Sequence, residues 1–296
     1  MPARLIINAD DFGLTAGVNR SIEELHHAHV LSSTTLMAKG PAFEDAVAIA
    51  KRNRLLGVGC HIVLTDGVPV CPPATIPSLV PNGRTFYSSL PAFTSAVVRG
   101  KVCELDILTE ALAQIGKLQA SGVFVTHLDT HKHTHLFPTV NRPLLEAARV
   151  SGVRTIRNPF EQPWSRALHH GTPLRQLQIC LLNMLQPRFQ ASPAIRHHAV
   201  ATTNGIFGIA DTGRLDTTSL QQLLEQLPQE GVWELVCHPG YSDHDLDRIK
   251  TRLRGQRQVE HAALLTVIPQ ALSQPAGPLL IHYGDLAPRS NVSQFV

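Results

Sequence analysis

A run near the middle of the chain carries an ionisable or metal-binding side chain at every second position. These side chains are His127, Asp129, His131, His133 and His135. Because side chains two residues apart point the same way in an extended chain, we expect them to line one face of a strand and of the loop that leaves it. Four imidazoles and a carboxylate would be costly to bury together unless they bind something. The spacing therefore predicts part of a metal-dependent active site.

Two adjacent carboxylates follow a short apolar run near the start of the chain. Residues 4–9 are mostly apolar, and Asp10, Asp11 and then Gly13 come after them. This order is typical of the mouth of a parallel α/β sheet, where such folds place their chemistry. Adjacent carboxylates usually point to opposite sides, which would let one bind a metal while the other acts as a base. Taken alone, the pair is also compatible with an Asx-turn or a helix cap before residues 16–29.

Two more histidines lie at the ends of predicted strands. His61 lies near the end of the apolar run 56–63, and His238 follows the run 233–237. In a parallel barrel all strand C-termini open on one face, so groups distant in sequence converge there. One carboxylate and two imidazoles with open positions form a common catalytic metal arrangement, which favours zinc or another first-row divalent ion, with magnesium also possible. Such an ion polarises a carbonyl and acidifies water, as amide hydrolysis requires.

The elements that must position these groups alternate along the chain. We expect strands at 4–9, 33–38, 56–63, 123–127, 153–157, 233–237 and 279–281, and helices at 16–29, 43–52, 104–120, 139–151, 218–227 and 259–272. Strands that alternate with helices imply a parallel sheet, and this many repeats predict a distorted, TIM-barrel-like (β/α) barrel. We expect one domain over residues 1–286, irregular loops at 69–91 and 159–198 that shape the substrate pocket, and a loose tail at 287–296.

Composition excludes several classes of protein. The 296 residues are 43% hydrophobic and 17% charged, with a net charge of +3, so neither disorder nor nucleic-acid binding is indicated. Because no run resembles a signal peptide or a bilayer span, we expect a cytoplasmic protein without stable membrane insertion. A basic cluster is interpreted as a solvated helix face; an anionic substrate or a membrane surface is the alternative for it. Its members are Arg248, Lys250, Arg252, Arg254 and Arg257.

Three motifs of this sequence resemble those of YdjC/ChbG-type carbohydrate deacetylases. They are the segments 10–13, 59–65 and 127–133, and the likeness runs from about Leu5 to about Leu286. The branch linked to hopanoid biosynthesis, HpnK, is also similar around residues 68–81. This resemblance implies a distorted (β/α) barrel and metal-dependent removal of acetyl groups from N-acetylated sugars. Both a chito-oligosaccharide and a hopanoid-linked glucosamine are open as substrates.

The same resemblance implies a role for each residue that matches its motifs. One divalent metal ion would be held by Asp11, His61 and His131. Asp10 would be the general base, and His238 the acid or transition-state stabiliser. His127 and Asp129 would lie behind the ligands and orient them. Relatives often have a histidine where this chain has Lys132, so we expect no ligand there.

Two other interpretations of the residues remain open. His127, Asp129 and the distant His238 have the order of the facial triad of a non-haem Fe(II) oxygenase, although such enzymes rarely alternate helix with strand. A non-catalytic metal- or sugar-binding protein, with the histidine run as a metal sink, is the second. A homodimer is the default oligomeric state.

Overall fold

The computed structural model of the protein describes residues 2–167, 180 and 182–286. The expected tail at 287–296 lies outside the described residues, as does part of the loop 159–198. No helix in the described part of the chain is both long and apolar enough to cross a membrane.

The strands form one seven-stranded sheet in which every pairing is parallel. They are β1 (Arg4–Phe12), β2 (Ser33–Leu36), β3 (Gly57–Ile62), β4 (Val125–Thr130), β5 (Gly205–Phe207), β6 (Val232–Cys237) and β7 (Leu279–Leu280). The order across the sheet is β4-β3-β2-β1-β6-β5, with β7 beside β1. From Leu5 onward β1 is buried on both faces, as expected for a central strand of a parallel sheet covered by helices and curled around its own interior.

Residues 154–162 connect the two edge strands of this sheet. Single bridges join Ile156 to Leu128 of β4, Thr155 to Ala201, and Glu161 to Ile206 of β5. The strand expected at 153–157 is therefore wrong as a regular element, although the segment lies where a barrel strand would. Only isolated bridges, and no run of consecutive residue pairs, join it to its neighbours, so no continuous ladder forms.

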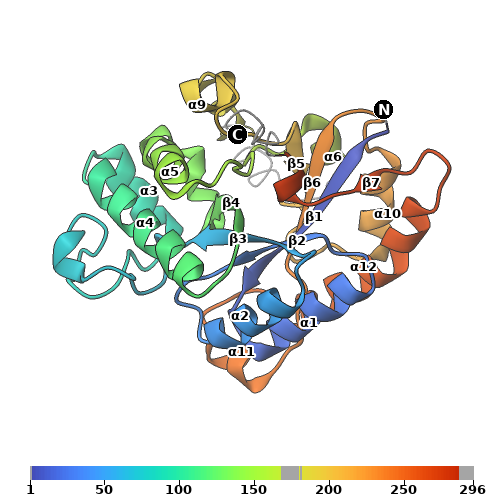
Figure 1. The fold of residues 1–296 in the computed structure, drawn as a ribbon, viewed down its shortest axis with the longest axis horizontal. Coiled ribbons are helices and arrows are strands. Elements are labelled where there is room, and N and C mark those ends of the chain that lie inside the picture. The colour runs from blue at the N-terminus through green and yellow to red at the C-terminus, as the bar shows by residue number, and fades with distance from the viewer. Residues whose placement is uncertain (1, 168–179, 181, 287–296) are drawn as a thin grey trace, which may run out of the picture.

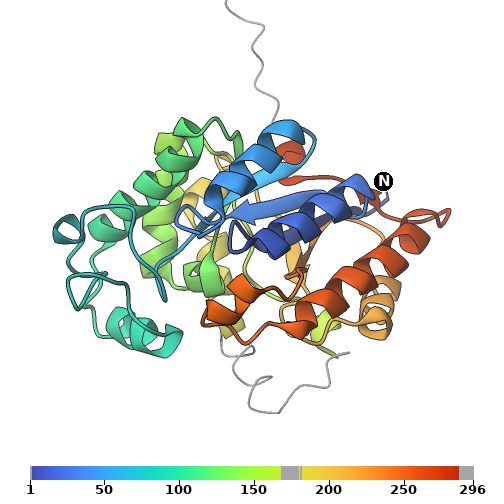
Figure 2. The same cartoon turned by 90° about the horizontal axis from the view of Figure 1, so that it is seen from below.

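Helices surround the sheet. The longer ones are α1 (Ala16–His27), α2 (Phe43–Arg52), α3 (Leu90–Val98), α4 (Glu104–Ala120), α5 (Pro138–Ser151), α10 (Thr217–Glu225) and α12 (Gly255–Leu272). The short ones are α6 (Pro163–Ala167), α8 (Gln186–Gln190), α9 (Pro193–Arg196) and α11 (His244–Arg248), with 3-10 turns η1 (Pro73–Thr75), η2 (His131–Leu136) and η3 (Tyr283–Leu286). In Figure 1, α4 and α5 pack together at one end of the sheet and α10 and α12 at the other. Figure 2 shows α1 and α2 side by side along one flank.

The loop 69–91 is held against α4 by buried carboxylates. Glu110 accepts hydrogen bonds from the backbone N–H groups of Val70 (2.8 Å) and Cys71 (3.0 Å), and Asp106 accepts one from Ser78 (2.8 Å). Buried backbone donors need such partners when no sheet or helix supplies them. The part of this loop from Val70 to Ser78 is thus fixed to α4.

Candidate active site and metal centre

A bulge near the end of β1 places the paired carboxylates. The register between β1 and β2 shifts between Ala9 and Phe12, and Asp11 has a left-handed backbone with φ of 68°. Bulges re-aim side chains next to active sites, and aspartate tolerates the left-handed region better than most residues. As a result, Asp10 and Asp11 are both buried and both lie near His61, rather than on opposite sides of the strand.

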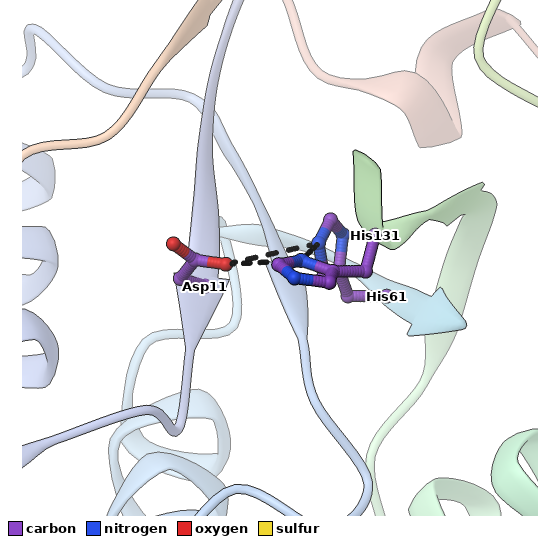
Figure 3. Close-up of side chains that lie close together, drawn as sticks. All are labelled: Asp11, His61 and His131. Atoms are coloured by element: carbon purple, nitrogen blue, oxygen red, sulfur yellow. Dashed lines mark hydrogen bonds and ion pairs between the residues drawn. The ribbon is translucent and has the colours of Figure 1, made fainter. Parts of the chain in front are cut away.

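Three side chains from separate elements converge beside the bulge (Figure 3). Asp11 Oδ1 lies 3.8 Å from His61 Nε2 of β3 and 3.7 Å from His131 Nδ1 of η2. The two imidazole nitrogens are 3.3 Å apart. One carboxylate oxygen and two imidazole nitrogens within this range fit a first-row divalent ion with open positions, and they fit calcium poorly because it prefers oxygen ligands. The donor set thus suits the predicted kind of metal.

The pKa values of these three groups are shifted in different directions. Burial opposes ionisation of Asp11, yet Arg257 and the neighbouring histidines outweigh it and lower the pKa of that carboxyl. Burial also disfavours the charged form of His61, but Asp129, Asp10 and Asp11 raise its pKa to about 9. For His131 burial dominates and lowers the pKa to about 4. A metal ion would therefore compete with a proton at His61 and would meet a neutral imidazole at His131.

Asp129 lies directly behind His61. Its Oδ1 is 2.8 Å from His61 Nδ1, so the opposite ring nitrogen faces Asp11. A carboxylate on the second nitrogen of a ligand histidine fixes the orientation of its ring. His127 shares the strand but stacks on Tyr283, with ring centroids 4.0 Å apart, and its Nδ1 lies 2.9 Å from the Thr126 hydroxyl. The structure thus gives Asp129 a contact that orients the candidate ligand His61, and it packs His127 against Tyr283.

Asp10 and His238 face each other across the site. Asp10 Oδ2 lies 3.8 Å from His238 Nε2. Burial would raise the pKa of Asp10, but Arg157, His61 and His238 lower it well below its usual range. The His238 backbone N–H donates to buried Glu260 of α12 at 2.6 Å, which fixes the turn after β6.

The histidine run does not continue as a strand. β4 ends at Thr130, and Lys132 and His133 both have positive φ, so the alternation expected of the later members is wrong. His135 is buried and lies 2.6 Å from the Thr130 hydroxyl and 3.2 Å from the Arg157 carbonyl oxygen. Lys132 points to Asp66, 2.5 Å away, and takes no place among the candidate ligands.

Two buried arginines at the site were missed by sequence reasoning. Arg157 contacts Asp10, and Arg257 of α12 donates to Asp11 Oδ2 at 2.6 Å. The basic cluster at 248–257 is therefore not one solvated face, because α11 ends at Arg248 and Arg257 is buried. The signal for Arg257 was its place on α12, where positions 257, 260, 261 and 264 share a helical face that ends in apolar residues.

The oxygenase triad does not assemble in the described part of the chain. Asp129 is engaged by His61 and Arg157, and His127 is stacked away from His238 on Tyr283. The groups of described residues that could hold a metal are Asp11 with His61 and His131, and Asp10 with His61 and Asp129. Neither group joins His127 to His238.

Residues 4–272 match the family model described as YdjC-like protein. The carbohydrate deacetylase of Brevibacillus brevis is 32% identical over 240 residues, covering 81% of this chain and 82% of the relative. That of Geobacillus stearothermophilus is 32% identical over 90% of each chain, and that of Vibrio parahaemolyticus 29% over 98% of each. A solved structure from Enterococcus faecalis V583, of a candidate cellobiose-phosphate cleavage protein, superposes with a TM-score of 0.77 at 26% identity, covering 97% of this chain and 100% of that one. This likeness confirms the expected barrel-like α/β fold.

Proposed function

This chain belongs to the YdjC-like protein family, as its motifs predicted, and on that basis we propose that it hydrolyses the N-acetyl amide of an acetylated amino sugar and releases acetate. Its relatives over most of their length are carbohydrate deacetylases. The observation that carries the proposal is the convergence of Asp11, His61 and His131 beside Asp10 and His238. Together they supply the groups that amide hydrolysis by a metallohydrolase needs.

Asp11, His61 and His131 would hold one divalent ion, zinc or magnesium. When bound, the ion would polarise the acetyl carbonyl and make a water molecule more acidic. Asp11 is suited to this task because Arg257 occupies its Oδ2 and leaves Oδ1 towards the two imidazoles. Asp129 would orient His61 through Nδ1, the ring nitrogen opposite the one that faces Asp11.

Asp10 would accept the proton of the attacking water through Oδ2. Its Oδ1 receives hydrogen bonds from Arg157, Asn8 and Thr35, whereas Oδ2 receives one from Arg157 and also faces His238. The water oxygen forms the new bond to the acetyl carbon, and the C–N bond then breaks. His238 would protonate the departing sugar amine, because a general acid close to the base can return the proton within one turnover.

The test is acetate release by metal-stripped protein with and without added Zn²⁺ or Mg²⁺. We would offer N,N′-diacetylchitobiose and an N-acetylglucosaminyl lipid, because the two acceptors separate the chito-oligosaccharide from the hopanoid-type substrate. Release that requires added metal and is absent in Asp11→Asn supports the proposal. Absence of acetate from both substrates, in protein that binds one metal ion, would reject it.

A further inference from the structure

Arg157, like Arg257, is among the largest fully buried side chains of the described residues. It comes from the irregular segment 154–162 that connects β4 to β5, and its backbone N–H donates to the carbonyl of Leu128 in β4. A buried guanidinium is expensive unless its donors all meet acceptors. The acceptors that surround the guanidinium of Arg157 therefore indicate its role.

Its three nitrogens contact carboxylates from three different strands. Nη1 and Nη2 form a two-pronged contact with Asp10 of β1, at 3.0 and 2.7 Å. Nη1 also lies 2.5 Å from Asp129 Oδ2 of β4. Nε and Nη2 lie 2.9 and 2.7 Å from Glu234 Oε1 of β6. The guanidinium thus links β1, β4 and β6, and two of its partners, Asp10 and Asp129, lie close to His61.

Two of these partners belong to the candidate site, and each also faces one of its histidines. Asp129 uses its other oxygen on His61 Nδ1, and Asp10 Oδ2 also faces His238. A planar guanidinium fixes the rotation of a carboxylate that it contacts through two nitrogens, as it does Asp10, and it holds one oxygen of Asp129 in place, whereas a lysine ammonium has no such fork. Tilting Arg157 would therefore turn Asp10 directly and His61 through Asp129.

We propose that Arg157 is a positioning residue that sets the orientation of Asp10 and, through Asp129, the orientation of the candidate metal ligand His61. The part of this inference that concerns Asp10 as a base rests on the proposed function. The part that concerns metal binding rests only on the contacts of Arg157 with Asp129 and of Asp129 with His61, which do not depend on the substrate.

A structural role for Arg157 would predict a different dependence. Glu234 is the third partner, and the Tyr283 hydroxyl donates to its other oxygen, away from the candidate ligands. If Arg157 served only to neutralise Glu234, a variant that lacks both charges would have the zinc affinity and turnover of the wild type. A positioning role requires the two-pronged guanidinium itself, so a variant with balanced charges but without the guanidinium would still bind zinc weakly.

The experiment compares Arg157→Lys with Arg149→Lys. Arg149 makes a two-pronged contact with Glu146 on the surface, so it controls for the loss of a fork away from the site. We would measure thermal unfolding, zinc affinity of the metal-stripped protein by calorimetry, and kcat and KM for acetate release. Arg157→Lys should weaken zinc binding by about 10–100-fold and lower kcat by about 10–100-fold with little change in KM, as expected for lost support of a ligand. Arg149→Lys should match the wild type in all three.

Folded Arg157→Lys with wild-type zinc affinity and kcat would overturn the proposal. If that variant fails to fold, Arg157→Met/Glu234→Gln takes its place, because it removes one charge of each sign. Wild-type zinc affinity and turnover in the double variant would equally overturn the proposal, whereas a folded double variant with weakened zinc binding would support it. Should wild-type protein release no acetate, the proposed function fails, while the zinc titration still decides whether Arg157 positions His61.

Discussion

The two oxygens of Asp11 are assigned to different partners. Oδ2 accepts from Arg257, and Oδ1 faces His61 and His131. Asp10, one residue earlier, is instead enclosed by Arg157 and faces His238. Beside the bulge in β1, neighbouring residues of the same type thus contact different sets of partners, which would allow them separate tasks.

Exchanging each carboxylate for its amide should separate metal binding from turnover. Asp11→Asn should lose the metal and the activity together, because a neutral amide is a poor ligand. Asp10→Asn should keep the metal and lower turnover by about 10²–10⁴-fold, as for a missing general base. Metal content by mass spectrometry and acetate release decide between these outcomes. Loss of metal from Asp10→Asn but not from Asp11→Asn would reverse the two assignments.

Arg257→Met should weaken metal binding without directly removing a candidate ligand. The guanidinium pairs with Asp11 inside the protein, and burial otherwise favours the protonated carboxyl. Without Arg257 the carboxyl would compete more strongly for a proton and lose its fixed orientation. Calorimetric zinc titration is the measurement, with Arg254→Met as the control because Arg254 pairs with Asp247 near the surface. Equal affinities in the two variants would contradict this role for Arg257.

At the scale of elements, apolar periodicity predicted most of the barrel, and the deviations lie at the site. The helix at 104–120 and the strand near 56–63 follow their patterns, because burial alone determines them. The bulge at Asp10–Asp11, the left-handed turn at Lys132–His133 and the bridging segment 154–162 do not. Their geometry depends on partners distant in sequence, which no local pattern encodes. Residue types therefore predicted the candidate ligands, but not the arginines behind them.

Gly59→Ala should destabilise the fold through the contact between β3 and β4. A Cβ at Gly59 would lie 2.5 Å from His127 Cε1, and Tyr283 stacks on that imidazole and restricts its movement. We expect a loss of about 1–3 kcal/mol in the free energy of unfolding, typical of overpacking in a core. Gly116→Ala in α4 is the matched control, since its Cβ would meet open space and alanine favours a helix by about 0.5–1 kcal/mol. Chemical denaturation of both variants tests the prediction, and an unchanged Gly59→Ala would refute it.

Across the whole molecule, the site joins segments from nearly the full length of the chain. Asp11 lies near the start, His131 near the middle and Arg257 near the end, and each is held by a different element. The single sheet brings them together because all its strands run parallel and β1 lies between β2 and β6. A ligand bound by Asp11, His61 and His131 would therefore connect β1, β3 and η2, and its binding energy would add to the stability of the fold.

Removing the metal should consequently lower the melting temperature of the whole protein. A ligand at 100 times its Kd stabilises the native state by about 2.7 kcal/mol, and each kcal/mol shifts the melting temperature by roughly 2–4 °C in chains of somewhat smaller size. We expect a chelator to lower the melting temperature by several degrees in wild type and in Asp10→Asn, which retains the ligands. Asp11→Asn should melt at the same temperature with or without chelator, because it has no metal to lose. Calorimetry at fixed protein and zinc concentrations measures all three. A chelator shift in Asp11→Asn as large as in wild type would mean that the stabilising metal is bound elsewhere in the molecule.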